Sequence, residues 1–176
     1  TTLFRSARSG NCNGRTQGGS NAEIVIADAF VKGLPNIDYH LALEAMLKDA
    51  TIPPGGNEEA EGRGGLIPYL ELGYIPYGIP RAGNRTIEYS YCDYAIALVA
   101  KGLGKTDLYQ QYLKQSSNWK NLWRADYEHA GVKGFILPRD KEGNWLDKIP
   151  FGNSHIQKPT FTYTPVTFEG PWYTPW

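Results

Sequence analysis

The chain has 176 residues, of which 41% are hydrophobic and 20% charged, so its composition is that of a folded domain and excludes a disordered chain. Its 18 Lys and Arg residues balance its 18 Asp and Glu residues. Without a basic stripe, a role in nucleic-acid or phosphate binding has no electrostatic support. No apolar run reaches the roughly 20 residues that a membrane-spanning helix needs.

The first predicted helix covers residues 22–32. Asn21 is a suitable N-cap before it, and Gly33 marks its end. Apolar residues fall on most sides of this helix, which indicates that it is buried nearly all round. Two acidic residues, Glu23 and Asp28, nevertheless lie within it.

The second predicted helix covers residues 38–50 and begins at Asp38. Its apolar residues gather on one face and its charged residues lie elsewhere, a pattern typical of an outer helix with one side in solvent. Residues 51–84 then form a Gly- and Pro-rich excursion. A structureless loop of this length in a compact domain is usually functional or wraps the surface.

The third predicted helix, residues 86–102, is apolar on every side and carries Glu88 and Asp93. We therefore expect it to be buried on all sides. An amphipathic helix follows at residues 106–116, with Thr106 as its N-cap.

The apolar face of this segment continues through Trp119, Leu122 and Trp123, which we expect to face inward. After them the hydrophobic period changes. Residues 134–146 predict a β-hairpin with residues 140–144 at its turn. The rest of the chain is a Pro-rich coil.

Two connections in the sequence are similar. The segments "KGLPNID" (residues 32–38) and "KGLGKTD" (residues 101–107) each join an apolar helix to an amphipathic one, and each apolar helix carries a Glu and an Asp five residues apart. Pairs of one buried and one half-exposed helix are what an α/α toroid requires. An α-solenoid is the competing architecture, although its repeats would be shorter and more regular.

The acidic residues of the two apolar helices need partners, because a buried carboxylate must be hydrogen-bonded or paired. Glu88 and Asp93 lie about 140° apart around their helix, so they do not form one paired site. We interpret Glu23, Asp28, Glu88 and Asp93 as structural carboxylates, with contact to substrate or metal as the alternative. We expect Asp93 to be the more deeply buried of its pair. It should accept a hydrogen bond from outside its own helix, from a Tyr hydroxyl, an Arg or a loop amide.

Other candidate sites carry less information. Asn84 begins the N-glycosylation sequon "NRT", which is used only in a eukaryotic secretory pathway. Cys12 and Cys92 allow one disulfide without requiring it. The three histidines show no metal-ligand spacing.

Four stretches of the chain, taken in order, resemble the glycoside hydrolase family 92 α-mannosidases. The resemblance covers most of residues 18–146. It is carried by "GSNAEIVIADAFVKGLPNIDYHLALEAMLKDA", "GLIPYLELGYIPYG", "NRTIEYSYCDYAIALVAKGLGKTDLYQQYLKQSSNWKNLW" and "GFILPRDKEGNW".

This resemblance implies an (α/α)6 toroid catalytic domain packed against an N-terminal β-sandwich. Residues 1–176 would be a mainly α fragment of that one domain, with about four helices and a small β-hairpin. The β-sandwich and the rest of the toroid would lie outside this chain. We therefore expect extensive apolar contacts with the rest of the polypeptide or with a companion chain.

The resemblance also implies an exo-acting, inverting and Ca²⁺-dependent enzyme that is secreted or at the cell surface. Its substrate would be a mannose-containing glycan, from which it removes terminal α-linked mannose. The catalytic base would lie beyond residue 176 and the Ca²⁺ ligands outside this chain, so this segment alone would be inactive.

Glu169 is the candidate general acid. Inverting hydrolysis uses a carboxylic acid near the leaving oxygen and a carboxylate base, roughly 6.5–9.5 Å apart. In the family the acid is a Glu in a segment resembling "YEG-x-x-W-x-Y", and the nearest match here is "TFEGPWYTPW". Trp172 follows Glu169 by three residues where the family pattern has four. A loop carboxylate is the alternative interpretation of Glu169.

A second interpretation of function is a non-catalytic α/α scaffold or carbohydrate-binding module that keeps the fold. A complete Glu motif and a paired-Asp segment further along the polypeptide would favour the enzyme. Their absence would favour the scaffold.

Overall fold

The computed structural model describes residues 21–55, 62–79, 81–129 and 131–145, together with the backbone of two short strands further on. The mainly helical fold with a small hairpin is as the sequence predicts, and helices occur in all four predicted places. The elements are α1 (Ala22–Val31), α2 (Tyr39–Thr51), α3 (Leu66–Leu72), α4 (Ala82–Gly102), α5 (Thr106–Gln115), the 3-10 helix η1 (Asn118–Leu122), β1 (Trp123–His129), β2 (Val132–Ile136), β3 (Gly152–Asn153) and β4 (Thr162–Tyr163).

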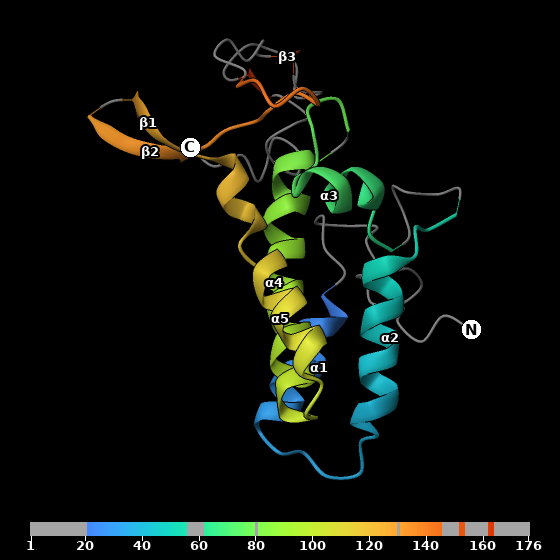
Figure 1. Ribbon diagram of the computed structural model, residues 1–176. Helices are drawn as coiled ribbons and strands as arrows, with labels where there is room; N and C mark the ends of the chain where they lie inside the picture. The colour runs from blue at the N-terminus through green and yellow to red at the C-terminus, as the bar shows by residue number, and fades with distance from the viewer. Residues whose placement is uncertain are drawn as a thin grey trace.

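The helix α4 is the centre of the arrangement, because α1, α2, α5 and η1 all contact it. Short connections join α1 to α2 and α4 to α5, and both lie at one end of the helices (Figure 1). The other end carries α3, η1 and the β1–β2 hairpin (Figure 1). The longer connections between the helices therefore lie together at one end of the helical layer.

Helix ends follow the local sequence. Asp38 caps α2 by accepting a hydrogen bond from the Leu41 backbone N–H at 3.0 Å, which satisfies one of the unpaired donors of the first turn. Gly33 follows the last turn of α1 with φ of +66°, a conformation that glycine adopts without a Cβ penalty. Asn21 is the N-cap of α1 as predicted, but its side chain makes no capping bond.

Two groups of buried apolar side chains hold the layer together. The larger group joins α1, α2, α4 and α5, and the smaller joins α3, the loop after it and α4. The larger consists of Ala27, Leu43, Met46, Ala50, Ala95, Ile96, Ala97, Val99, Ala100 and Tyr112. The smaller consists of Leu66, Tyr69, Ile75, Ala82 and Tyr89.

The excursion predicted at residues 51–84 contains a helix that the sequence pattern did not reveal. Glycines in the left-handed conformation, Gly65 (φ +72°) and Gly73 (φ +74°), stand at the two ends of α3. With seven residues, α3 is too short to show a helical period. The excursion also ends earlier than predicted, because α4 already begins at Ala82.

The inward orientation predicted for the tryptophans is wrong. The chain leaves the α-helix after Gln115 and passes through η1 into β1, so the helical face that would have carried them inward ends. Leu122 is buried, whereas Trp119 and Trp123 are 37% and 42% exposed. Their rings meet edge to face, with centroids 6.4 Å apart.

The hairpin lies earlier in the chain than predicted. Strands β1 and β2 pair antiparallel, and the ring of Trp123 covers the bare Cα of Gly134. The predicted turn at residues 140–144 exists as a separate feature, in which Asp140 accepts a hydrogen bond from the Asn144 backbone N–H at 2.7 Å. An isolated bridge between Arg139 and Trp145 closes it. The repeated glycines of this region permit both turns, and the sequence predicted only the second.

Both apolar helices keep one exposed apolar side, contrary to the expectation of burial all round. On α1, Val25 and Val31 are 69% and 68% exposed, and on α4, Tyr91 and Tyr94 are 54% and 43% exposed. Exposed apolar residues at these positions are what the expected contacts with further polypeptide would cover. That expectation stays a prediction.

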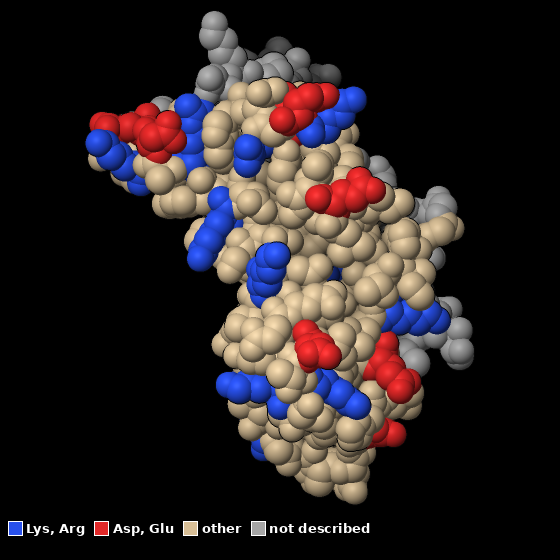
Figure 2. All heavy atoms as spheres, viewed as in Figure 1, with Lys and Arg blue, Asp and Glu red and all other residues tan. Residues whose placement is uncertain are grey.

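Charges of both signs are scattered over the face of the molecule that Figure 2 shows, as the balanced composition suggests. Within the described part of the chain, none of the helices combines the length and the hydropathy that crossing a membrane requires.

The close approach of α1 to α4 gives a test of the packing. A Cβ at Gly102 would overlap the ring of Phe30, so Gly102→Ala should destabilise the fold by about 1–3 kcal/mol through overpacking. The cost should be smaller in a Phe30→Leu background, because the obstructing ring is gone. Thermal melts of the two single variants and the double variant measure this coupling. Equal costs in both backgrounds would contradict the contact.

Candidate functional site

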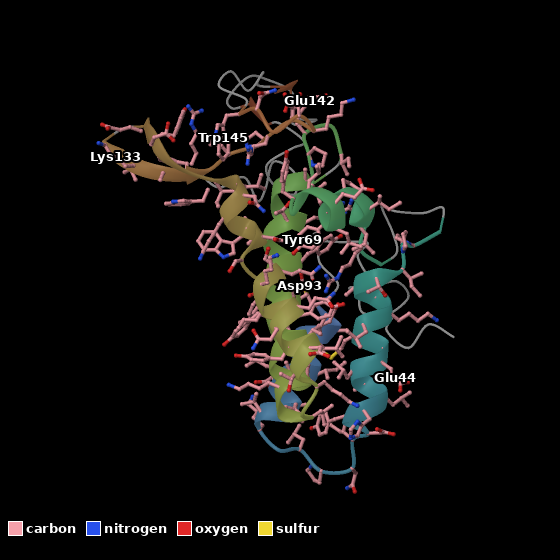
Figure 3. The ribbon with its side chains drawn as sticks, in the orientation of Figure 1. Glu44, Tyr69, Asp93, Lys133, Glu142 and Trp145 are labelled. Atoms are coloured by element: carbon pink, nitrogen blue, oxygen red, sulfur yellow. The ribbon has the colours of Figure 1, made fainter. Side chains whose placement is uncertain are left out.

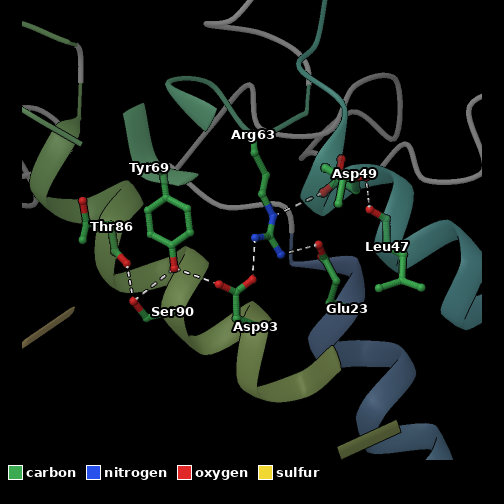
Figure 4. A network of polar contacts seen from close by, with 9 residues as sticks. Glu23, Leu47, Asp49, Arg63, Tyr69, Thr86, Ser90 and Asp93 are labelled. Carbon is green, nitrogen blue, oxygen red and sulfur yellow. Dashed lines mark hydrogen bonds and ion pairs between the residues drawn. The ribbon is translucent and has the colours of Figure 1, made fainter. Parts of the chain in front are cut away.

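Arg63 is the centre of the most charged buried site in the described residues. It enters from the segment between α2 and α3, its side chain is 1% exposed, and its guanidinium faces carboxylates from three helices (Figure 4). Its Nη1 donates to Asp93 Oδ1 at 2.7 Å and its Nη2 to Glu23 Oε1 at 3.1 Å. Its Nε lies 3.8 Å from Asp49 Oδ2. We call Arg63, Glu23, Asp49 and Asp93 the Arg63 cluster.

Asp93 has the environment predicted from the sequence. It is 1% exposed, and its second oxygen accepts a hydrogen bond from the Tyr69 hydroxyl at 2.8 Å. Arg63 and Tyr69 both belong to elements other than α4, so the expected hydrogen bond from outside its own helix is confirmed twice. With a cation on one oxygen and a hydroxyl on the other, Asp93 is a fully partnered buried carboxylate.

Glu23 lies in the first turn of α1 and is 1% exposed. Burial raises its pKa from 4.5 to about 8, because a charged carboxylate loses its hydration there. Arg63 opposes this rise, and the nearby Asp49 adds to it through its charge and a hydrogen bond. Glu23 is therefore the acid of the cluster that most readily holds a proton.

The guanidinium of Arg63 stays charged in this setting. Burial alone would lower its pKa, but Asp93 and Glu23 outweigh that effect and hold the pKa well above its usual value. Its Cζ also lies 5.2 Å from the ring centre of Tyr89, a cation–π arrangement. The fork of guanidinium donors suits this task, since one planar group reaches several carboxylates.

The Arg63 cluster joins elements rather than facing a ligand. Glu23, Arg63 and Asp93 have side chains that are each 1% exposed, so a sugar cannot reach them. Asp49 is only slightly more open, at 15%. Asp93 lies among the helices, and Tyr69 reaches it from α3 (Figure 3). The cluster ties α1, α2 and α4 to the segment before α3, which agrees with the structural interpretation of Glu23 and Asp93.

Two of the four predicted buried carboxylates do not belong to this cluster. Asp28 is a correction, because its side chain is 59% exposed and forms an ion pair with Lys32 at 2.7 Å. Glu88 is half-buried on α4, and burial raises its pKa. It lies apart from Asp93, as the angle between them predicted.

Arg63 was not predicted as a site residue, because "EGRGG" has the composition of a turn. The missing signal was electrostatic. Two helices predicted to be buried carried acids, and a protein interior needs a cation to match them. Among the arginines that the structure describes, Arg63 and Arg85 are the two that are buried.

A second cluster fixes the turn near the hairpin. The guanidiniums of Arg139 and Arg124 lie 4.8 and 5.7 Å from the ring centre of Trp145. Arg139 also donates to the Gly143 carbonyl from Nε (2.8 Å) and Nη2 (2.6 Å), and to the Asn121 carbonyl from Nη1 (3.2 Å). These contacts join η1 to the turn at residues 140–144. They therefore hold both segments together at the end of the molecule that carries the long connections.

The remaining predicted sites are only partly visible. Glu169 and Cys12 lie outside the described residues. Asn84 is half-buried in the first turn of α4, and the Thr86 hydroxyl of the same sequon is buried, donating to the Ala82 carbonyl at 2.8 Å. The use of this sequon stays a prediction. Cys92 is buried, and burial raises the pKa of its thiol.

The described residues do not fit the Ca²⁺ site that the family resemblance implies. No three His, Cys, Asp or Glu side chains among them gather in a way that could hold a metal ion. The three carboxylates of the Arg63 cluster already face a cation, the guanidinium. A divalent ion there would meet that positive charge at close range.

Comparison with known proteins gives the chain a family context. Residues 2–173 match the family described as "Glycosyl hydrolase family 92 catalytic domain". The chain is 45% identical over 161 residues to an uncharacterized secreted glycosidase of Arthroderma benhamiae, an alignment that covers 82% of the chain and 20% of that protein.

Two solved structures are similar as well. A family GH92 inverting mannosidase of Bacteroides thetaiotaomicron matches 94% of the chain with a TM-score of 0.72 and 30% identity. A GH92 α-mannosidase of the same bacterium, in complex with mannoimidazole, matches 80% with a TM-score of 0.62 and 32% identity. The chain spans 20% and 17% of these two proteins, so it corresponds to about a fifth of its relatives' length.

The partners of Asp93 predict a loss of stability when it is removed. Asp93→Ala leaves Tyr69 and one arm of Arg63 without their acceptor and should lower the free energy of unfolding by about 1–3 kcal/mol. Turnover per folded molecule should change less. Glu44→Ala, at an exposed position of α2, is the control and should stay within about 0.5 kcal/mol. Thermal melts and kinetics on the full-length protein check both. An unchanged melting temperature with abolished turnover would assign Asp93 to catalysis instead.

Proposed function

Because the chain belongs to the catalytic domains of glycosyl hydrolase family 92, we propose that the protein containing it is an exo-acting α-mannosidase. In this proposal the enzyme removes terminal α-linked mannose from a glycan and inverts the anomeric configuration. One observation carries the proposal. The similarity to the inverting mannosidase extends over 94% of the chain, at 30% identity and a TM-score of 0.72.

The described residues would serve this enzyme as part of its helical framework. We assign α1 and α4 as inner helices, and α2 and α5 as outer helices, of one (α/α)6 toroid. The exposed apolar sides of α1 and α4 would then face neighbouring helices of the ring. The end with the long connections would be the one that carries functional loops, because loops rather than helices hold most binding residues.

Catalysis in this proposal needs two carboxyl groups on opposite sides of the bond to be broken. One acts as a general acid and protonates the leaving oxygen, while the other acts as a general base and takes a proton from the attacking water. Glu169 is our candidate for the acid. The general base would lie outside this chain. The Arg63 cluster supports the framework and takes no part in the proton transfers.

The A. benhamiae relative is described as secreted, and we extend this to the present protein as part of the proposal. A secreted or cell-surface enzyme would meet mannose-containing glycans directly. The Ca²⁺ dependence also stays in the proposal, with ligands outside the described residues.

The activity test uses the full-length protein. We expect it to release mannose from an α-mannobiose, with β-mannose as the first product seen by NMR before mutarotation. A β-mannoside and an α-glucoside serve as substrate controls and should remain intact. α-Mannose as the first product would contradict inversion. Binding of mannan without any release would favour the non-catalytic scaffold.

Metal removal tests the cofactor separately. Dialysis of the full-length enzyme against a chelator should abolish mannose release, and added Ca²⁺ should restore it. The melting temperature gives a parallel readout of metal binding, because a ligand that binds the folded state stabilises it. Full activity in a preparation shown by elemental analysis to be free of Ca²⁺ would remove Ca²⁺ from the proposal.

The role of Glu169 has its own prediction. Glu169→Gln cannot protonate a leaving group and should lower kcat/KM on α-mannobiose by about 10²–10⁴-fold. A mannoside with an activated aryl leaving group should lose much less, because it departs without protonation. Glu142→Gln, an exposed carboxylate in the 140–144 turn, is the matched control. Equal activity of Glu169→Gln and the control would make Glu169 a loop carboxylate.

A further inference from the structure

The Arg63 cluster contains more negative than positive charge. Three carboxylates, Glu23, Asp49 and Asp93, lie within 3.8 Å of one guanidinium. Ionisation of all three would leave a net charge of minus two in the described surroundings, in a site where Glu23, Arg63 and Asp93 are each 1% exposed. Burying uncompensated charge is costly, and a titratable group responds by taking up a proton.

The hydrogen bonds show which acid takes the proton. Asp93 accepts from both Arg63 and Tyr69, so each of its two oxygens already has a donor and none of its own protons is needed for these bonds. Glu23 and Asp49 meet the other side of the guanidinium, at Nη2 and Nε, close enough to each other for a hydrogen bond. Two ionised carboxylates are acceptors only, so a bond between them requires a proton.

We propose that Glu23 and Asp49 share one bound proton at neutral pH, held on Glu23, and that Arg63, Asp93 and this pair form a pH-sensitive tie between α1, α2 and α4. Glu23 is the better holder because its side chain is 1% exposed, against 15% for Asp49. With this proton the cluster carries a net charge of minus one instead of minus two, because the guanidinium compensates one of the two remaining carboxylates.

Titratable groups from three other elements surround Glu23. Asp49 faces it from α2 and Arg63 from the segment before α3. From α4, Asp93 and Cys92 contribute to the same field. The tyrosines of the cluster's surroundings, Tyr69, Tyr89 and Tyr112, have pKa values raised by burial and are neutral hydroxyls in this range.

The direction of the pH effect follows from the two states. In the unfolded chain Glu23 titrates at its ordinary 4.5, whereas in the folded protein it titrates at about 8. Between these values the folded state holds one more proton than the unfolded state, so stability falls as the pH rises. Below 4.5 the full contribution is present, and above about 8 the loss is complete.

The test compares melting temperatures of the full-length protein across this pH range. Glu23→Gln carries an amide that donates to Asp49 at every pH, so it mimics the protonated acid. The melting temperature of the wild type should fall relative to Glu23→Gln as the pH rises from 4.5 to about 8, and the difference should then level off. Glu44→Gln, an exposed acid of α2, is the matched control and should follow the wild type.

Asp49→Asn provides a second and less buried variant. Its amide donates to an ionised Glu23, so the shared proton is no longer needed and the pH-dependent fall should flatten. Parallel profiles for the wild type and Glu23→Gln would overturn the proposal, because they would show Glu23 ionised throughout. A wild-type fall that persists unchanged in Asp49→Asn would overturn the sharing with Asp49. These outcomes do not depend on mannose release, so they are separate from the proposed activity.

Discussion

The structure depends on a positive charge placed where water cannot reach it. The side chain of Arg63 is 1% exposed, and it is stable there only because carboxylates from α1, α2 and α4 surround it. The dependence is mutual, since each of these acids would be destabilising without the guanidinium. The apolar groups on either side of the cluster supply most of the burial. The charges restrict which helices can occupy which positions around α4.

The buried charges and the connections available for function lie at different places along the same helices. The Arg63 cluster and the larger apolar group lie within the helical layer, while η1, the hairpin and the Arg139 contacts lie at the end with long connections (Figures 1 and 3). A family whose members act on glycans gains from this arrangement, because the connections can vary while the helices keep their register. The buried charges therefore concern the helical framework, whereas the family's activity concerns the connections at its end.

The sequence predicted those features that arise from local pattern. Helix positions, the start of the second helix at Asp38, the stop at Gly33 and the deep burial of Asp93 all follow from residues close together in the chain. The features it missed depend on distant residues. Arg63 lies in a glycine-rich stretch, and its role appears only when Glu23 and Asp93, 40 and 30 residues away, reach it in space. The burial of Asp28 was predicted wrongly, because a helix that is apolar on most sides does not indicate which side contacts a neighbouring helix. Glu169 is outside the described residues, so its role rests on the family motif.

The wide spacing of these contacts along the chain has a consequence for folding. Asp93 can meet Arg63 only after the intervening chain has closed on itself, and Glu23 only after an even longer closure. Closing such loops costs chain entropy before any contact repays it. A partly assembled layer would hold bare acids in an apolar setting, which is an unfavourable intermediate. The cluster thus penalises half-formed states and makes α1, α2 and α4 acquire their final packing together, as one cooperative unit.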